Sequence, residues 1–131
     1  MKIGDYYYSK FLDGNFDDIQ KKVTDSLAEK GFGIITEIDV SATMKKKLNV
    51  DFRKYKILGA CNPEFAHKAL SVEDKIGTML PCNIIIQELE PDKIEVAAVN
   101  PKASMQAIAN ESLLTIASEV DLLLKTVIEK L

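Results

Sequence analysis

The two cysteines of this chain are the residues best suited to chemistry, and each lies in a short motif with an asparagine and a proline. The motifs are Ala-Cys-Asn-Pro at residues 60–63 and Leu-Pro-Cys-Asn at residues 80–83. A thiolate is a nucleophile, a redox group and a ligand for soft metals, so two neighbouring thiols can form a binding or a redox site. The candidate ligand-binding residues are therefore Cys61, Asn62, Pro63, Cys82 and Asn83.

Each motif lies where a predicted strand meets a helix or a turn. Residues 55–60 form a short apolar strand, and Asn62-Pro63 then starts a helix, because asparagine accepts bonds from free N–H groups and proline has none to lose. A second strand, residues 82–90, follows after Gly77. If these strands are antiparallel neighbours, the two thiols lie at the same end of the sheet, within the range of a disulfide or a bridging metal.

Two interpretations of the cysteines stay open at this point. In the first, Cys61 lies beside a helix N-terminus, where the free N–H groups of residues 64–66 favour a thiolate or a bound anion. In the second, both cysteines are small buried residues at strand ends, since unpaired cysteine is among the most buried residue types. The asparagines have the same structural alternative, with Asn62 as a helix cap and Asn83 as a strand-edge residue.

A metal site needs more ligands than the two cysteines supply. His67 is the only histidine, and its position on a helical wheel predicts that it points to solvent. We therefore expect no cofactor, with a soft metal held between Cys61 and Cys82 as the alternative. No Ser/His/Asp or Cys/His/Asn set can be assembled around this one histidine, so we predict no catalytic residues.

Composition limits the class of protein and its partners. The 131 residues predict a single domain over 1–131, large enough to bury a core without disulfides. The 17 basic and 20 acidic residues leave a net charge of −3, which provides no overall field to attract nucleic acid or a membrane. The N-terminal residues lack the apolar core of a signal peptide, and no apolar run is long enough to span a bilayer. These features predict a cytoplasmic protein with reduced thiols.

One cluster of basic residues departs from this balance. It consists of Lys45, Lys46, Lys47, Arg53, Lys54 and Lys56. Such a cluster can contact phosphates, or it can be the solvated face of a short helix and the loop that follows. No aromatic residues are interleaved with it in the manner of a single-strand binder, so the sequence does not favour nucleic acid as a partner.

Hydrophobic periodicity and capping residues predict the remaining elements. In chain order they are a strand over 6–11, a helix over 15–30, a strand over 32–40, a short helix capped by Ser41, a strand over 55–60, a helix over 62–76, strands over 82–90 and 93–100, and a long helix over 113–131. The order β-α-β-(α)-β-α-β-β-α predicts an α+β fold, a mainly antiparallel sheet with helices packed on one face.

Two of these helices carry more specific expectations. In the short helix, Met44 and Leu48 are expected to face inward while the lysines face water. In the long helix, Leu122 and Leu123 widen the apolar stripe, and the extra width can serve a partner subunit. The run Ile84-Ile85-Ile86 indicates that part of the second sheet face is also covered, which a dimer interface would do.

Taken together, these residues resemble the DUF302 family through nearly the whole chain. The resemblance is carried by Gly31-Phe32, by Ile38-Asp39-Val40 before the lysine-rich helix, and by the spacing between the two cysteine motifs. It implies a small α+β domain with a sheet-and-helix arrangement like that of the TATA-box-binding protein, found as a dimer. It implies no established activity.

The leading functional hypothesis is a cytosolic homodimeric binding or sensing module. Its pocket near Cys61, Asn62, Pro63 and Cys82 would take a small anion, a soft metal or an electrophile. One alternative is a thiol-dependent redox protein or enzyme in which Cys61 is the nucleophile and Cys82 its partner. Another is a structural or interaction protein that acts through its dimer surface.

Overall fold

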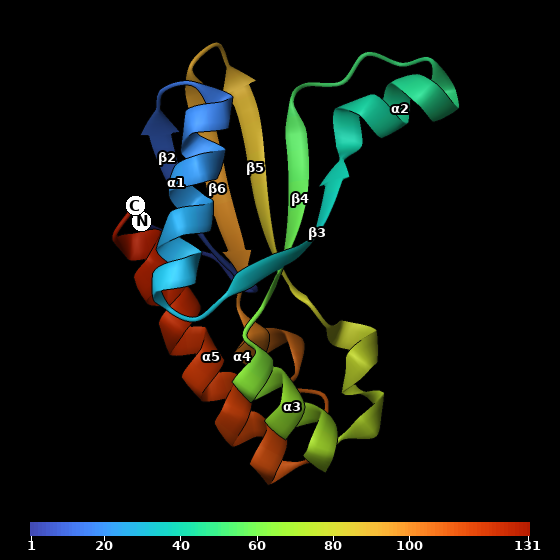
Figure 1. Cartoon of the computed structure of the whole chain (residues 1–131), viewed down its shortest axis with the longest axis vertical. Coiled ribbons are helices and arrows are strands. Elements are labelled where there is room, and N and C mark those ends of the chain that lie inside the picture. The colour runs from blue at the N-terminus through green and yellow to red at the C-terminus, as the bar shows by residue number, and fades with distance from the viewer.

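The computed structural model describes all 131 residues and confirms the α+β class. Six antiparallel strands form one sheet in the order β1-β2-β6-β5-β4-β3, with helices packed on one side (Figure 1). The strands are β1 (Lys2–Ile3), β2 (Tyr7–Asp13), β3 (Gly33–Asp39), β4 (Tyr55–Cys61), β5 (Cys82–Glu90) and β6 (Lys93–Val99). The helices are α1 (Phe16–Glu29), α2 (Val40–Leu48), α3 (Pro63–Val72), the 3-10 helix η1 (Asp74–Met79), α4 (Pro101–Ser104) and α5 (Glu111–Glu129). None of them is long and apolar enough to cross a membrane.

Helix α1 forms where capping and periodicity predict it. The Asn15 side chain accepts hydrogen bonds from the backbone N–H groups of Asp17 and Asp18, at 2.9 and 3.2 Å. Gly31 follows the helix with φ +84°, a left-handed conformation that glycine adopts without steric cost. The buried face repeats at three or four residues and consists of Phe16, Ile19, Val23 and Leu27.

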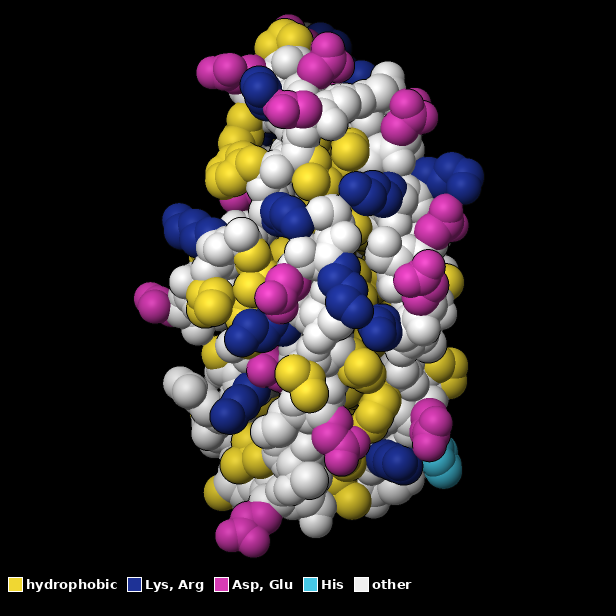
Figure 2. All heavy atoms as spheres, turned by 90° about the vertical axis from the view of Figure 1, so that its left-hand side faces the viewer, with side chains coloured by type: hydrophobic (Ala, Val, Ile, Leu, Met, Phe, Trp, Pro, Cys, Tyr) yellow, Lys and Arg dark blue, Asp and Glu magenta, His cyan; other side chains and the backbone are white.

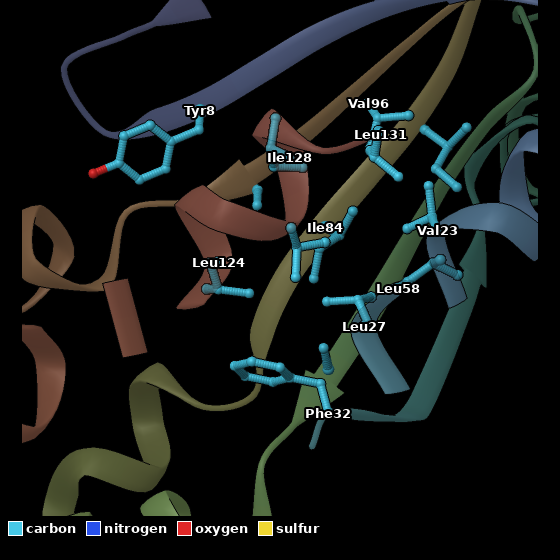
Figure 3. Packing of buried hydrophobic residues seen from close by; sticks show 14 of the residues in the cluster. Tyr8, Val23, Leu27, Phe32, Leu58, Ile84, Val96, Leu124, Ile128 and Leu131 are labelled. Atoms are coloured by element: carbon cyan, nitrogen blue, oxygen red, sulfur yellow. The ribbon is translucent and has the colours of Figure 1, made fainter. Parts of the chain in front are cut away.

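The hydrophobic core lies between the sheet and helices α1 and α5. Strand alternation directs every second residue of β4, β5 and β6 toward these helices, and the apolar ones in the middle of the strands are buried: Leu58, Ala60, Ile84, Ile86, Ile94, Val96 and Ala98. Figure 3 shows side chains that converge from both layers: Val23 and Leu27 from α1, Leu124 and Ile128 from α5, and Leu58, Ile84 and Val96 from the strands. The core therefore fixes α5 across the sheet over its C-terminal half.

Polar contacts from β2 hold the same helix in place. The Tyr8 hydroxyl donates to Asp121 Oδ1 at 2.8 Å and accepts from Asn100 Nδ2 at 3.3 Å. Burial, and next the hydrogen bond to Asp121, raise the pKa of Tyr8 to about 12. Lys10 Nζ donates to the backbone carbonyls of Glu129 and Leu131, at 2.9 and 2.6 Å.

Helix α2 corrects a prediction. It begins at Val40 and is capped by Asp39 instead of Ser41, since Asp39 Oδ1 accepts from Ala42 N at 3.0 Å. It buries no residue: Met44 is half-buried and Leu48 is 66 % exposed, so the expectation that both face inward is wrong. The physical reason is visible in Figure 1, where α2 projects away from the body and has no layer to cover.

The apolar stripe of α5 is wider than the part that this chain buries. Leu122 is 64 % exposed and Leu123 is half-buried, so Leu122 contributes nothing to the core of this chain. The sheet also leaves one face without a helix, and Ile57, Ile85 and Val99 are half-buried there. The coverage expected for that face is not supplied within one chain.

Candidate functional site

A partly open cavity of about 190 Å³ lies at the end of the sheet where both cysteine motifs are found. Figure 1 shows α3, α4 and the N-terminal half of α5 extending past this end of the strands. The helices contribute Phe65, Ala66 and Ala69 from α3, Pro101 from α4, Met105 after it, and Leu113, Ile116, Ala117 and Val120 from α5. The remaining lining residues are Phe32, Ile35, Ala60, Cys61, Asn62, Leu80, Pro81 and Cys82. No charged side chain lines the cavity.

The structure brings together three of the five residues that the sequence singled out. Cys61, Asn62 and Cys82 line the cavity, whereas Pro63 is the exposed first residue of α3. Asn83 is exposed and lines a separate groove on the uncovered sheet face. Its separation from Cys82 follows from strand alternation, which sends consecutive side chains to opposite faces.

The two thiols lie at the same end of neighbouring antiparallel strands, as predicted, but they are not aligned. Ala60 is the cross-strand partner of Cys82, and Cys61 is one residue farther along β4. Both cysteines are free thiols, Cys82 buried and Cys61 half-buried. The cavity reaches both of them because it lies beyond the end of the β4–β5 pair.

The environment of Cys82 disfavours its thiolate. Burial, with a smaller contribution from the neighbouring Cys61, raises the pKa of the Cys82 thiol to about 11. A thiol with this pKa is protonated at neutral pH and is a poor nucleophile. Cys82 is therefore an apolar part of the cavity wall.

The N-terminus of α3 offers fewer free donors than expected. Of the N–H groups of Glu64, Phe65 and Ala66, two are already bonded: Phe65 N donates to Asn62 Oδ1 at 3.5 Å, and Ala66 N donates to the Asn62 carbonyl at 2.9 Å. Asn62 Nδ2 in turn donates to the Lys30 carbonyl at 3.3 Å. Asn62 is thus a cap and a link between α3 and the end of α1.

The side chains that usually bind hard or borderline metal ions do not come together in this protein. No group of three or more His, Cys, Asp or Glu residues is placed to hold a metal ion. His67 is exposed on α3, as its helical position predicts. What the site offers is an apolar space with one amide and two thiols at its edge.

Sequence reasoning did not identify the α4 and α5 side of the cavity. Leu113, Ile116 and Ala117 are readable as an apolar stripe, but a stripe that lines a cavity and one that fills a core have the same pattern. The signal that could have found it is the abundance of small residues at facing positions. Ala60, Ala66, Ala69 and Ala117 all line the space.

The comparisons with known proteins support the fold described above. The chain matches the family model described as "Domain of unknown function DUF302" over residues 8–131. A crystal structure of an uncharacterized conserved DUF302 protein from Bacillus stearothermophilus has a TM-score of 0.86 to this structure at 22 % identity. The match covers 95 % of this chain and 96 % of that chain. No curated protein matches.

Proposed function

This chain belongs to the DUF302 family, and from its cavity we propose that it is a binding module for a small, uncharged, apolar molecule. The observation that carries the proposal is the lining: every residue but Asn62 has an apolar or thiol side chain. Because a desolvated charge without a partner is costly, such a wall favours a neutral ligand over an anion. This ligand differs from the classes expected from the sequence, which are a small anion, a soft metal and an electrophile.

The size of the cavity indicates the size of the ligand. An enclosed apolar cavity of about 150 Å³ in an engineered protein binds benzene. A space of about 190 Å³ therefore suits a molecule somewhat larger than benzene, such as toluene or indole. Asn62 already donates one amide hydrogen and accepts one hydrogen bond, so one amide hydrogen and one acceptor site of its side chain remain for a ligand.

The thiol-dependent alternative has less support. A dithiol redox pair needs two sulfurs facing each other and one of them with a lowered pKa. Here the cross-strand partner of Cys82 is Ala60, and the pKa of Cys82 is raised. A soft metal at Cys61 and Cys82 meets the same difficulty, because the ligand must be deprotonated.

The proposal includes a cytoplasmic homodimer as the working form. Free thiols suit a reducing compartment, and the uncovered sheet face with half-buried Ile57, Ile85 and Val99 is a surface that a second subunit would cover. The third possibility is an interaction protein without a ligand, which acts through its dimer surface and the C-terminal helix α5. The expected likeness to the TATA-box-binding protein stays a prediction.

The experiment compares neutral and charged probes by thermal unfolding. Toluene and indole should raise the melting temperature by several degrees when present far above their Kd, since a ligand that binds only the folded state stabilises it. Benzoate, similar in size but charged, should have no effect. Ala117→Leu fills the cavity and should abolish the response to toluene.

The control is Ala28→Leu, the same substitution at an exposed position of α1. It should leave the response to toluene unchanged. Ala69→Leu, in the part of the cavity wall that α3 supplies, provides a second test if Ala117→Leu lowers the melting temperature severely. The proposal would be refuted if toluene and benzoate raised the melting temperature equally. It would also be refuted if Ala28→Leu and Ala117→Leu reduced the response to toluene by the same amount.

A further inference from the structure

All but one of the basic residues noted in the sequence lie in a protruding arm, defined here as residues 40–54, which comprises α2 and the segment after it; the exception, Lys56, lies in β4. We infer that this arm docks on an anionic lipid surface. The inference concerns a part of the molecule remote from the cavity, and it is independent of the proposed small-molecule function.

Charge is strongly separated between the arm and the body. The arm carries five of the 17 basic residues and one of the 20 acidic residues, so its net charge is +4 while the rest of the chain carries −7. Lys45 is paired with Asp51 at 3.2 Å, whereas Lys46, Lys47 and Lys54 have no ion pair. The overall charge of −3 conceals this local positive potential.

Exposed apolar side chains accompany the lysines. Leu48, Val50 and Phe52 are 66, 46 and 38 % exposed, and α2 has no buried residue. Lysines in the last turn of α2 can be explained by the helix dipole alone, but the dipole does not explain these apolar side chains. Basic residues beside exposed aliphatic residues are typical of segments that lie in the membrane interface.

The side of the molecule away from the arm has a different surface. Figure 2 shows basic and acidic side chains interspersed there, without a field of one sign. A negatively charged surface would therefore attract the arm and not this side, which gives the molecule a preferred orientation.

Lipid explains the arm better than nucleic acid does. Aliphatic residues such as Leu48 and Val50 gain nothing from phosphates or bases but gain free energy in the acyl boundary of a bilayer. The one aromatic ring, Phe52, is already stacked against the Arg53 guanidinium at 4.4 Å, which occupies a face that a base would use.

The test is co-sedimentation of the purified full chain with vesicles. Wild-type protein should bind phosphatidylglycerol–phosphatidylcholine vesicles, bind phosphatidylcholine vesicles much more weakly, and dissociate as salt rises. Lys46→Glu/Lys47→Glu should lower the partition coefficient at least about 25-fold, at about fivefold for each lysine lost. Lys21→Glu/Lys22→Glu makes the same charge change on α1 and should have little effect.

A second pair of variants separates lipid insertion from simple attraction to a polyanion. Leu48→Ser/Val50→Ser keeps the charge of the arm and should weaken vesicle binding about tenfold or more, because the apolar contact is lost. The proposal is overturned if wild-type protein does not bind anionic vesicles. It is also overturned if Lys21→Glu/Lys22→Glu weakens vesicle binding as much as Lys46→Glu/Lys47→Glu does. It is also overturned if the serine variant binds as well as wild type, or if an oligonucleotide of equal charge is bound as tightly as the vesicles.

Discussion

Cys82 lies opposite Ala60 in the β4–β5 ladder, one residue away from alignment with Cys61. Because the side chains of cross-strand partners lie side by side, the direct neighbour of Cys82 across the ladder is Ala60, and the Cys61 thiol is offset from it by one residue along β4. A disulfide needs its Cβ atoms within about 4.5 Å and its Cβ vectors converging, which this arrangement opposes. The cysteines thus contribute to a cavity wall without forming a dithiol.

The two thiols should differ in reactivity. Cys82 is 8 % exposed with its pKa raised to about 11, whereas Cys61 is half-buried. Iodoacetamide at pH 8 should therefore label one thiol in native protein and two in urea, as counted by mass spectrometry. Cys61→Ser should abolish native labelling and Cys82→Ser should not. Equal labelling of both thiols, or a disulfide after mild oxidation, would contradict this account.

Stability should fall at alkaline pH through Cys82. Its pKa is about 11 in the folded protein against 9.0 for an ordinary thiol, so the unfolded chain loses this proton first as pH rises. The stabilisation is complete below pH 9 and is lost between pH 9 and pH 11. At pH 10.5 the loss amounts to about 2 kcal/mol, from about 1.4 kcal/mol for each pKa unit.

Urea unfolding at pH 8 and pH 10.5 measures this effect. Cys82→Ala should reduce the difference in unfolding free energy between the two pH values by about 2 kcal/mol. The remaining pH dependence should include Tyr8, whose pKa is about 12 in the folded protein against 10.0 ordinarily. Stability that rises with pH over this range would contradict the sign of both shifts.

Asn62 should be a structural residue with two separable roles. Its side chain accepts from Phe65 N and donates to the Lys30 carbonyl. Asn62→Ala removes both contacts and should cost about 1–2 kcal/mol in unfolding free energy. Asn62→Asp keeps the acceptor and places a negative charge at the helix N-terminus, where the helix dipole stabilises it. Its cost in unfolding free energy should therefore be smaller than that of Asn62→Ala. Equal costs for the two variants would assign the whole effect to the contact with Lys30.

Gly59 should be the least tolerant position of β4. A Cβ there would meet the Thr36 hydroxyl oxygen and lie 2.6 Å from Pro81 Cγ. Gly59→Ala should therefore cost about 1–3 kcal/mol, as overpacking does. The matched control is Gly33→Ala in β3, where a Cβ meets nothing within 4 Å and the cost should stay within about 0.5 kcal/mol. Thermal unfolding of the two variants should separate them clearly.

Local sequence signals predict most of the elements. Asn15, Asn62 and Gly31 mark helix ends through hydrogen bonds or dihedral angles that involve only nearby residues. The buried face of α1 is predicted by apolar residues spaced three or four apart, and these residues do pack in the core. The two-residue strand β1 was missed because it is defined by pairing with Ser9 and Tyr8, which its own sequence does not encode.

Predictions that depended on tertiary placement were less successful. Whether Met44 and Leu48 are covered depends on where α2 points, and a helical wheel contains no information on that. Cys61, Asn62 and Cys82 could be grouped because a single helical excursion separates their strands. Met105 and Ala117 could not be added, because their approach to the cysteine end depends on how α4 and α5 pack beyond the sheet.

The most direct test of the proposed binding site is an NMR titration of the protein with toluene, with every amide shift recorded. The account predicts saturable shifts confined to the cavity wall, at Ala66 and Ala69 of α3, at Ala117 of α5 and at the adjoining ends of β4 and β5. Shifts centred on Ile85 and Ala97 of the uncovered sheet face, with none at the three alanines, would contradict it. So would the absence of any saturable shift up to the solubility limit of toluene.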